Sequence, residues 1–189
     1  MIKRILSLFI ALLLTFSCAA AEDYNLSGLH LYGMDFTINY PWDWSVDVDD
    51  SENTGTDQYC GLLYSPTDTG LNVEIYKYYL EDWADYTMLN TTSDELASYI
   101  DLYTETGSDY QYSYVDTIYT GRDGIPFLIF SAYDEYGHMY VAETMMDGWF
   151  ITLYGYAYID GTYTNCRNLF STDLDLFKAI VQTYHPLSK

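Results

Sequence analysis

Hydrophobic and polar residues alternate over much of this chain with a period of two, which is the pattern of half-buried β-strands. The alternation begins in the segment FTINY, residues 36–40, and stops at Pro41, because proline cannot donate a hydrogen bond to a neighbouring strand. It resumes over residues 44–48, and again over 59–64 and 71–79. The last two segments are separated by the turn-forming sequence SPTDTG, so they are predicted to form a hairpin.

The period changes to that of a helix after Asn90. Thr92 is followed three residues later by Glu95, which is the arrangement of a capping box at the start of a helix. Apolar residues then recur at the spacing of one helix face, namely Leu96, Tyr99, Ile100 and Tyr103. We therefore predict an amphipathic helix that ends near Gly107. A second stripe of this kind predicts a final helix over residues 172–184.

Four more segments with the strand pattern lie between these helices, over residues 110–120, 125–133, 139–146 and 150–158. Their connections are short and contain glycine, and Asp147-Gly148 is a typical two-residue hairpin turn. Since short connections join antiparallel neighbours, the segments predict a four-stranded meander. Residues 125–130 are apolar throughout, which indicates a strand covered on both faces. The predicted fold class is α+β, with a mainly antiparallel sheet flanked by helices.

Residues 1–21 are predicted to be a secretory signal peptide. The segment starts with two basic residues, continues with an apolar run and ends in three alanines. Its apolar run is shorter than the roughly 20 residues that cross a bilayer. Residues 22–189 then have the length of one domain, with a core over about 36–186. An alternative is a lipoprotein in which Cys18 becomes the acylated first residue; both interpretations place the mature chain outside the cytoplasm.

Outside the cytoplasm two cysteines can form a disulfide. Cys60 and Cys166 are the two that follow the predicted signal peptide, and they are a candidate pair. Neither lies close in sequence to another cysteine or to a histidine, so their spacing does not indicate a zinc site.

The charge of the chain restricts its partners. The formal net charge is −21, and without the predicted signal peptide five basic residues face 28 acidic ones, which gives −23. Such a charge repels phosphate backbones and anionic lipids, so we expect neither a nucleic-acid partner nor electrostatic membrane docking. Cationic partners, divalent ions and neutral glycans stay compatible with it. The aromatic content of 19% argues against a disordered chain.

Motifs with catalytic spacing are not found. The three histidines, His30, His138 and His185, lie in separate segments, and no serine elbow or phosphate-binding glycine loop occurs. Carboxylates are numerous but fall mostly in polar loops, where nothing would shift a pKa for acid catalysis. We therefore predict that the protein is not an enzyme. A hydrolase based on two carboxylates, at least one of them buried in a cleft, is the enzymatic alternative.

The acidic segment DVDDSEN contains the best candidate metal ligands, Asp47, Asp49 and Asp50. Calcium takes several closely spaced oxygen ligands. Counting from Asp47, however, Glu52 and Gln58 stand where an EF-hand loop has glycine and glutamate. We therefore interpret this segment as a solvated turn, with calcium binding as the alternative, and expect no other cofactor.

Tyrosine is unusually frequent, with 23 residues. Two rows with a period of two place their side chains on one face of a strand each. The rows are Tyr110, Tyr112 and Tyr114, and Tyr154, Tyr156 and Tyr158. They are candidate ligand-binding residues for a protein, peptide or glycan, or else strand formers packed beneath the helices. Trp42 is a further candidate for stacking, although we expect it to be partly buried under a neighbouring loop, while Trp44 closes one end of the core.

Two groups of residues in this chain resemble the sequence pattern of the PsbP-like fold family. The first group is Phe36, Ile38, Tyr40, Pro41, Trp44 and Val46, and the second is Phe177, Ile180, Val181 and Tyr184. The resemblance implies an α-β-α sandwich. It also implies a family whose members mostly act as non-catalytic binding or assembly modules, including photosystem-associated subunits and secreted or lipid-anchored bacterial proteins, the branch that this chain is similar to. No catalytic residues are shared across that family.

The sequence therefore predicts a secreted or envelope-associated, non-catalytic binding module for a protein, peptide or glycan. A calcium-dependent binding module that uses the acidic loops is the alternative, and a carboxylate-based hydrolase is the second one.

Overall fold

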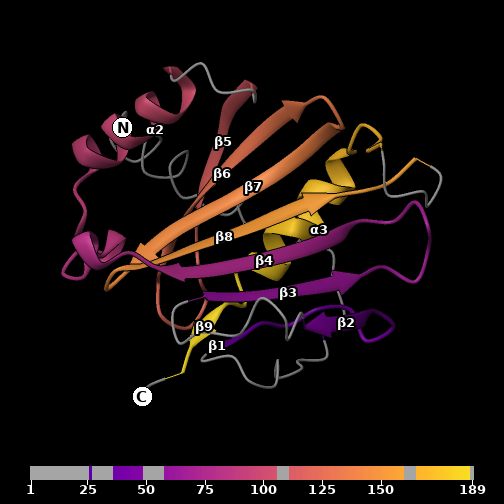
Figure 1. Ribbon diagram of the computed structural model, residues 1–189, viewed down its shortest axis with the longest axis horizontal. Coiled ribbons are helices and arrows are strands. Elements are labelled where there is room, and N and C mark those ends of the chain that lie inside the picture. The colour runs from indigo at the N-terminus through magenta and orange to yellow at the C-terminus, as the bar shows by residue number, and fades with distance from the viewer. Residues whose placement is uncertain (1–25, 27–35, 49–57, 106–110, 160–164, 188–189) are drawn as a thin grey trace, which may run out of the picture.

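The computed structural model describes residues 26, 36–48, 58–105, 111–159 and 165–187. Within them, seven strands form one antiparallel sheet in the order β2-β3-β4-β8-β7-β6-β5 (Figure 1). The strands are β2 (Ser45–Val48), β3 (Gln58–Tyr64), β4 (Asn72–Tyr79), β5 (Gln111–Tyr119), β6 (Pro126–Asp134), β7 (Gly137–Met146) and β8 (Trp149–Tyr156). The helices are α2 (Ser93–Glu105) and α3 (Ser171–Val181), with short 3₁₀ turns η1 (Glu81–Trp83) and η2 (Met88–Asn90) before α2.

The predicted hairpin and the predicted meander are both confirmed. Strand β3 pairs with β4, and β5, β6, β7 and β8 follow one another as antiparallel neighbours. The turn between β7 and β8 places Asp147 and Gly148 at φ values of 49° and 79°, as a type I′ turn requires. The sequence did not predict that β4 pairs with β8, which joins the hairpin and the meander into one sheet.

Helix α3 covers one face of this sheet and lies behind it in Figure 1. Its side chains Phe177, Ile180 and Val181 are fully buried against apolar side chains of the strands. Gly155 of β8 lies directly beneath the ring of Phe177, because a Cβ atom there would be 2.7 Å from Cδ2 of that ring. The absence of a side chain at Gly155 therefore lets the helix approach the sheet closely.

Helix α2 packs on the opposite face, so the domain is the predicted α-β-α sandwich. The capping box is present: the Glu95 N–H donates to Thr92 Oγ1 at 3.3 Å, and the Thr92 N–H donates to Glu95 Oε2 at 2.8 Å. The bond from the Thr92 N–H, and then a bond from the Thr92 hydroxyl to the same Oε2 at 2.7 Å, lower the pKa of Glu95. Leu96, Tyr99 and Ile100 of α2 pack on a cluster that includes residues 128 and 130 of β6. Since residues 127 and 129 contact the α3 side, β6 is covered on both faces as predicted.

The first predicted strand differs from the expectation. Only β1 (Phe36–Thr37) is paired as a strand, and its partner is β9 (His185–Pro186) in a separate two-stranded sheet. Ile38 and Tyr40 are nevertheless buried, so this segment contributes to the core rather than to the main sheet. Trp44 packs partly buried against that core, in line with its predicted role.

The predicted signal peptide, with Cys18, and the first histidine, His30, lie outside the described residues. Among the helices that the structure does describe, none has the length and apolar character of a membrane span.

Candidate functional site

The face of the main sheet opposite α3 carries most of the predicted site residues. Alternate side chains of a strand point to the same face, and the register arranges those of neighbouring strands in rows. The first row is Cys60, Tyr76, Thr152, Glu143 and Leu128. The second row is Leu62, Glu74, Tyr154, Val141, Phe130 and Tyr114. The third row is Asn72, Tyr156, Met139, Ala132 and Tyr112.

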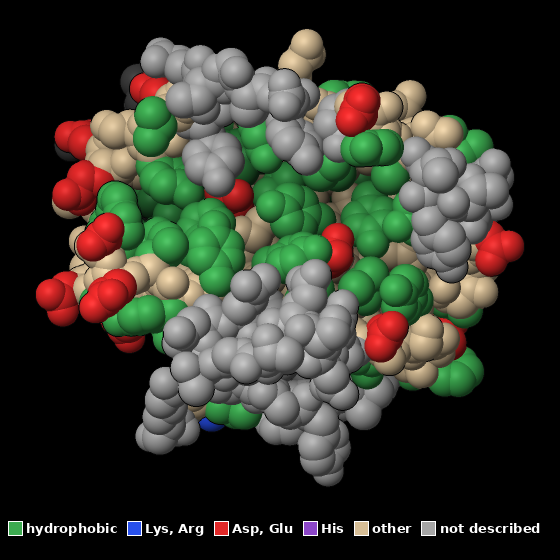
Figure 2. Space-filling view, in the orientation of Figure 1, with side chains coloured by type: hydrophobic (Ala, Val, Ile, Leu, Met, Phe, Trp, Pro, Cys, Tyr) green, Lys and Arg blue, Asp and Glu red, His purple; other side chains and the backbone are tan. Residues whose placement is uncertain are grey.

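Helix α2 covers the β5, β6 and β7 part of this face, and no described helix covers the part formed by β3, β4 and β8. We call that second part the tyrosine face. It consists of Cys60, Leu62, Tyr64, Glu74, Tyr76, Thr152, Tyr154 and Tyr156. Figure 2 shows the molecule from this side, with a broad band of hydrophobic side chains that includes tyrosine and with acidic side chains inside the band.

The two predicted tyrosine rows thus share one face of the sheet, but their surroundings differ. Tyr112 and Tyr114 of β5 lie edge-on to Phe130, with ring centroids 6.0 and 6.1 Å apart, and Tyr112 belongs to the cluster under α2. Tyr154 and Tyr156 belong to the tyrosine face, and Tyr154 also packs against the edge of that cluster. Tyr110 lies outside the described residues. Tyr158 follows the end of β8.

The tyrosine rings meet edge to face. Tyr76 and Tyr154 have ring centroids 5.8 Å apart and planes at 77°, and Tyr156 and Tyr158 have centroids 5.2 Å apart and planes at 66°. The Tyr76 hydroxyl donates to Glu74 Oε1 at 2.7 Å. Burial, and then this bond to Glu74, raises the pKa of Tyr76 above its usual value. Burial and a hydrogen bond with Tyr158 likewise raise the pKa of Tyr156. These phenols therefore stay neutral at physiological pH and offer hydroxyl groups.

Glu143 of β7 is a second carboxylate on this face, and it is 2% exposed. The Tyr99 hydroxyl of α2 donates to its Oε2 at a long 3.4 Å. Thr152 stands directly opposite on β8, and its buried Oγ1 has no hydrogen-bond partner among the described residues. Burial, and then the charge of Glu143, raises the pKa of Tyr78. The tyrosine face and its border with α2 thus combine aromatic rings with two carboxylates.

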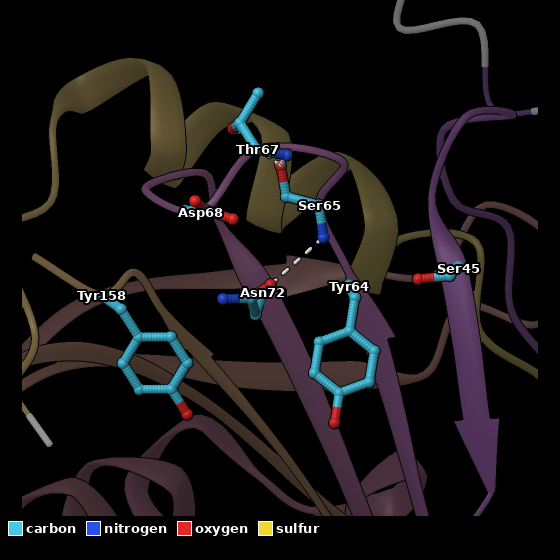
Figure 3. Close-up of a pocket in the computed structure, with 7 residues that line it drawn as sticks. All are labelled: Ser45, Tyr64, Ser65, Thr67, Asp68, Asn72 and Tyr158. Atoms are coloured by element: carbon cyan, nitrogen blue, oxygen red, sulfur yellow. Dashed lines mark hydrogen bonds between the residues drawn. The ribbon is translucent and has the colours of Figure 1, made fainter. Parts of the chain in front are cut away.

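A polar pocket of about 330 Å³ lies at the end of the tyrosine face. Its lining is shown in Figure 3 and consists of Ser45, Tyr64, Ser65, Thr67, Asp68, Asn72 and Tyr158. The Ser65 N–H donates to Asn72 Oδ1 at 3.1 Å, which fixes the amide. The Tyr64 and Tyr158 rings lie on either side of Asn72 in this view, so the pocket offers hydroxyl and amide groups next to aromatic rings.

A larger pocket of about 610 Å³ lies elsewhere, beside β9 and the turn between β7 and β8. Lys77 lines it from β4, with Nζ 4.4 Å from the centre of the Trp149 ring. His185 Nδ1 pairs with Asp123 Oδ2 at 2.5 Å on its wall. Because acidic and basic side chains both line this pocket, its charge favours no class of ligand.

The described histidines are held by local bonds, as expected. His138 is buried in β7, where its Nδ1 accepts the Leu169 N–H at 3.1 Å and its Nε2 lies 2.9 Å from Ser131 Oγ. A neutral ring with the proton on Nε2 satisfies both bonds. Burial lowers the pKa of His138, although the charge of Asp173 opposes this shift.

The other candidate residues are not brought together. Asp47 is exposed in β2, and Asp49 and Asp50 lie outside the described residues. Within the described part of the chain, no group of three or more histidine, cysteine or acidic side chains is arranged to hold a metal ion. Trp42 is 69% exposed, so the expected partial burial was wrong. It lies in a tight turn closed by a bond from the Trp44 N–H to the Pro41 carbonyl, which leaves its ring outside the core.

The candidate disulfide is not formed in the structure. Cys60 is buried and lies in the same row as Thr152 of β8. Cys166 instead pairs with Tyr158, which comes six residues after Thr152 in the chain. At about 3.3 Å per strand residue this offset is about 20 Å. The Cα atoms of a disulfide lie within about 7 Å, so this fold keeps the two cysteines too far apart.

The sheet order and the helix on each face define a PsbP-like fold, as the sequence predicted. Among solved structures, the solution structure of cyanobacterial PsbP (CyanoP) from Synechocystis sp. PCC 6803 matches this chain with a TM-score of 0.50. The match covers 89% of this chain and 96% of that chain, at 15% sequence identity. At this identity the similarity establishes the fold alone. No family model matches the sequence, and the comparison with curated proteins finds no match.

The carboxylates Glu74 and Glu143 and the hydroxyl of Thr152 were not among the residues predicted from the sequence. A signal for one of them was present, because Glu143 is the single charged residue in the segment MYVAETMM. An acid inside an otherwise apolar strand indicates a buried or half-buried carboxylate with a specific partner. The convergence of the three residues depends on the pairing of β4 with β8, which has no local signal.

Proposed function

We propose that this protein is a non-catalytic binding module that holds a peptide segment of a partner protein on its tyrosine face. The observation that carries the proposal is this face itself: tyrosines of β3, β4 and β8 lie side by side where no described helix covers the sheet. Tyrosine is favoured in binding surfaces because its ring buries a large apolar area while its hydroxyl reaches polar groups.

The ring geometry favours a peptide over a glycan. Sugars stack on flat, accessible aromatic faces, whereas the tyrosine pairs here meet edge to face. Half-buried apolar neighbours such as Leu62 and Met139 add surface that suits peptide side chains. The polar pocket at the end of the face can then take a polar group of the same segment.

The predicted signal peptide at residues 1–21 supports this proposal, because it would place the protein outside the cytoplasm. The PsbP-like fold adds support by resemblance, because that family mostly contains binding and assembly modules. Fold alone does not assign function, so the tyrosine face itself has to be tested.

The test uses the purified protein and a displayed library of random peptides. Peptides selected on the wild type are measured against Tyr154→Ala and against the control Tyr119→Ala, which removes a 57% exposed tyrosine of β5. We expect Tyr154→Ala to weaken the selected peptides at least tenfold and the control to leave them unchanged, with both variants folded by circular dichroism. Equal binding by Tyr154→Ala would refute the proposal. Binding of sugars on a glycan array, with no peptide selected, would refute the ligand class.

A further inference from the structure

We infer that the polar pocket at the end of the tyrosine face binds an uncharged carboxamide side chain, a glutamine or asparagine of the bound segment, on the amide of Asn72. This inference rests on the proposed function and names the group of the ligand that the pocket takes. It is carried by the orientation of the Asn72 amide, by the open volume beside it and by the donors and acceptors that line the pocket.

The Asn72 side chain is buried, but its amide nitrogen faces the pocket. Asn72 is 4% exposed and stands at the start of β4. Its Oδ1 accepts the Ser65 N–H at 3.1 Å, and because an N–H has to meet the oxygen rather than the NH2 group, this bond fixes the direction of the amide. Figure 3 shows Nδ2 turned away from Ser65, toward the side where Asp68 and Tyr158 lie. Among the described residues, none accepts a hydrogen bond from this nitrogen.

A buried NH2 group that lacks an acceptor costs free energy, so a ligand group that brings an acceptor to it is bound favourably. The pocket of about 330 Å³ gives such a group access, because Asn72 itself is part of the lining. This volume lies within the usual range of ligand pockets, about 300–1,000 Å³, and is enough for one side chain. The described residues thus form a site with an unmatched donor and open space in front of it.

The loop at the rim of the pocket is held in place by local bonds. The Gly70 N–H donates to the Thr67 carbonyl at 2.9 Å, and a Cβ atom at Gly70 would overlap Ser65 Oγ, so glycine permits this tight packing. Arg167 Nε donates to the Thr69 carbonyl at 2.9 Å, which anchors the loop to the segment before α3. A rim that is ordered in advance loses little conformational entropy on binding, and this favours the recognition of one particular group.

The donors and acceptors of the pocket select an uncharged amide. Asn72 Nδ2 needs an acceptor, whereas Asp68 at the rim offers carboxylate oxygens that accept. A carboxylate side chain would supply the acceptor but is repelled by Asp68 and by the net charge of −21. Lysine and arginine suit Asp68 but bring no acceptor to Asn72. A carboxamide has a carbonyl oxygen for Asn72 and an NH2 group for Asp68, so it matches both.

The pocket continues the tyrosine face. Tyr64 belongs to both, and Asn72 stands opposite Tyr156 of β8 in the sheet. Figure 3 shows the Tyr64 and Tyr158 rings on either side of Asn72, where they can contact the methylene groups of an entering glutamine side chain. A segment that lies along the tyrosine face can therefore place one side chain in the pocket. A sugar hydroxyl also donates and accepts, so the experiment includes sugars as ligands that would contradict the inference.

The experiment sequences the peptides that are selected from a displayed random library on the purified wild-type protein, and then measures the most enriched peptide by isothermal calorimetry. Asn72→Asp keeps the acceptor for the Ser65 N–H and the shape of the side chain, but replaces the NH2 donors by a carboxylate oxygen. The matched control is Asn90→Asp in η2, an exposed asparagine outside the tyrosine face.

We expect glutamine or asparagine to be enriched severalfold at one position of the selected peptides. Asn72→Asp should weaken the most enriched peptide about tenfold, the scale of one lost hydrogen bond replaced by a repulsive contact, and the control should change it less than twofold. A second variant, Asp68→Ala, changes an exposed residue and so tests the inference even if Asn72→Asp fails to fold by circular dichroism. It should weaken the same peptide about threefold, but not a derivative with leucine at the enriched position.

Five results would overturn the inference: no enrichment of glutamine or asparagine, unchanged binding by Asn72→Asp, unchanged binding by Asp68→Ala, equal weakening by the Asn90→Asp control, or binding on a glycan array that Asn72→Asp abolishes. The Tyr154→Ala measurement separates the two proposals. If Tyr154→Ala loses the selected peptides while Asn72→Asp and Asp68→Ala keep them, the amide inference fails and the proposed function stands; if none of the three variants changes binding, both fail.

Discussion

Replacing Gly155 by alanine tests how closely α3 is seated on the sheet. The added Cβ atom would lie 2.7, 3.0 and 3.2 Å from Cδ2, Cε2 and Cγ of the Phe177 ring. Carbon atoms in contact are normally about 3.5–4.0 Å apart, so the ring has to retreat by close to about 1 Å. Phe177 is completely buried in the main core, and neighbouring side chains have to move with it.

The expected cost is that of overpacking a core, about 1–3 kcal/mol. For a chain of this length each kcal/mol corresponds to about 2–4 °C, so the melting temperature should fall by about 2–12 °C. Thermal unfolding followed by circular dichroism measures this shift. The matched control is Gly121→Ala, where the nearest atom to the new Cβ is the Gln182 carbonyl oxygen at 3.9 Å. This control should change the melting temperature little, or raise it slightly by restricting the unfolded chain.

Equal melting temperatures for the two variants would refute the packing described for α3. If both variants melted at a lower temperature than the wild type, the conclusion would instead be that both glycines are needed for their backbone freedom. At neither position does the structure place φ in the left-handed region, so close approach to Phe177 is the property that distinguishes Gly155.

Four further predictions concern other parts of the molecule. The free energy of unfolding in urea should fall as the pH drops below about 6.5. Burial lowers the pKa of His138, so this histidine takes up a proton in the unfolded chain at a higher pH than in the folded one. The decrease should be smaller in His138→Asn, which has no imidazole to protonate. Arg167→Lys should lower that free energy by about 1–3 kcal/mol, since lysine cannot reproduce the two bonds to Asp173 at 2.8 and 3.1 Å; an unchanged urea midpoint would count against this fork. The melting temperature should be the same in millimolar calcium as in excess chelator, whereas a rise of several degrees with calcium would assign a calcium site to the acidic segment. The intact mass of the exported protein should match a chain starting at Glu22, and a heavier, acylated chain starting at Cys18 would establish the lipoprotein alternative.

Much of the secondary structure was predictable because its signals are local. The capping box of Thr92 and Glu95 and the turn at Asp147-Gly148 each act within a few residues, and the structure contains both. The pairing of β4 with β8 and of β1 with β9 joins segments far apart in the chain. Such pairings depend on which surfaces remain after the local elements form, so no single segment encodes them.

The candidate site was predictable only in part for a related reason. The period of two correctly placed Tyr112 with Tyr114, and Tyr154 with Tyr156, on one face of their strands, while Tyr158 lies beyond the end of β8 and Tyr110 lies outside the described residues. Which tyrosines are covered depends on the helices, and the cluster on which α2 packs takes in Tyr112 of β5 and also Tyr154 of β8. Trp42 was predicted to be partly buried under a neighbouring loop, but the tight turn that exposes it depends on a backbone bond that side-chain patterns do not reveal.

The pairing of β4 with β8 also affects how binding and folding are coupled. It is the seam between two units that can each form locally, the β3–β4 hairpin and the β5–β8 meander, and closing it requires a long-range encounter that is slow in proteins. Tyr76 lies on one side of this seam, and Tyr154 lies on the other. A ligand held by both sides would therefore act as a clamp that slows the opening of the sheet along this line, and the binding site would exist only in chains that have completed folding.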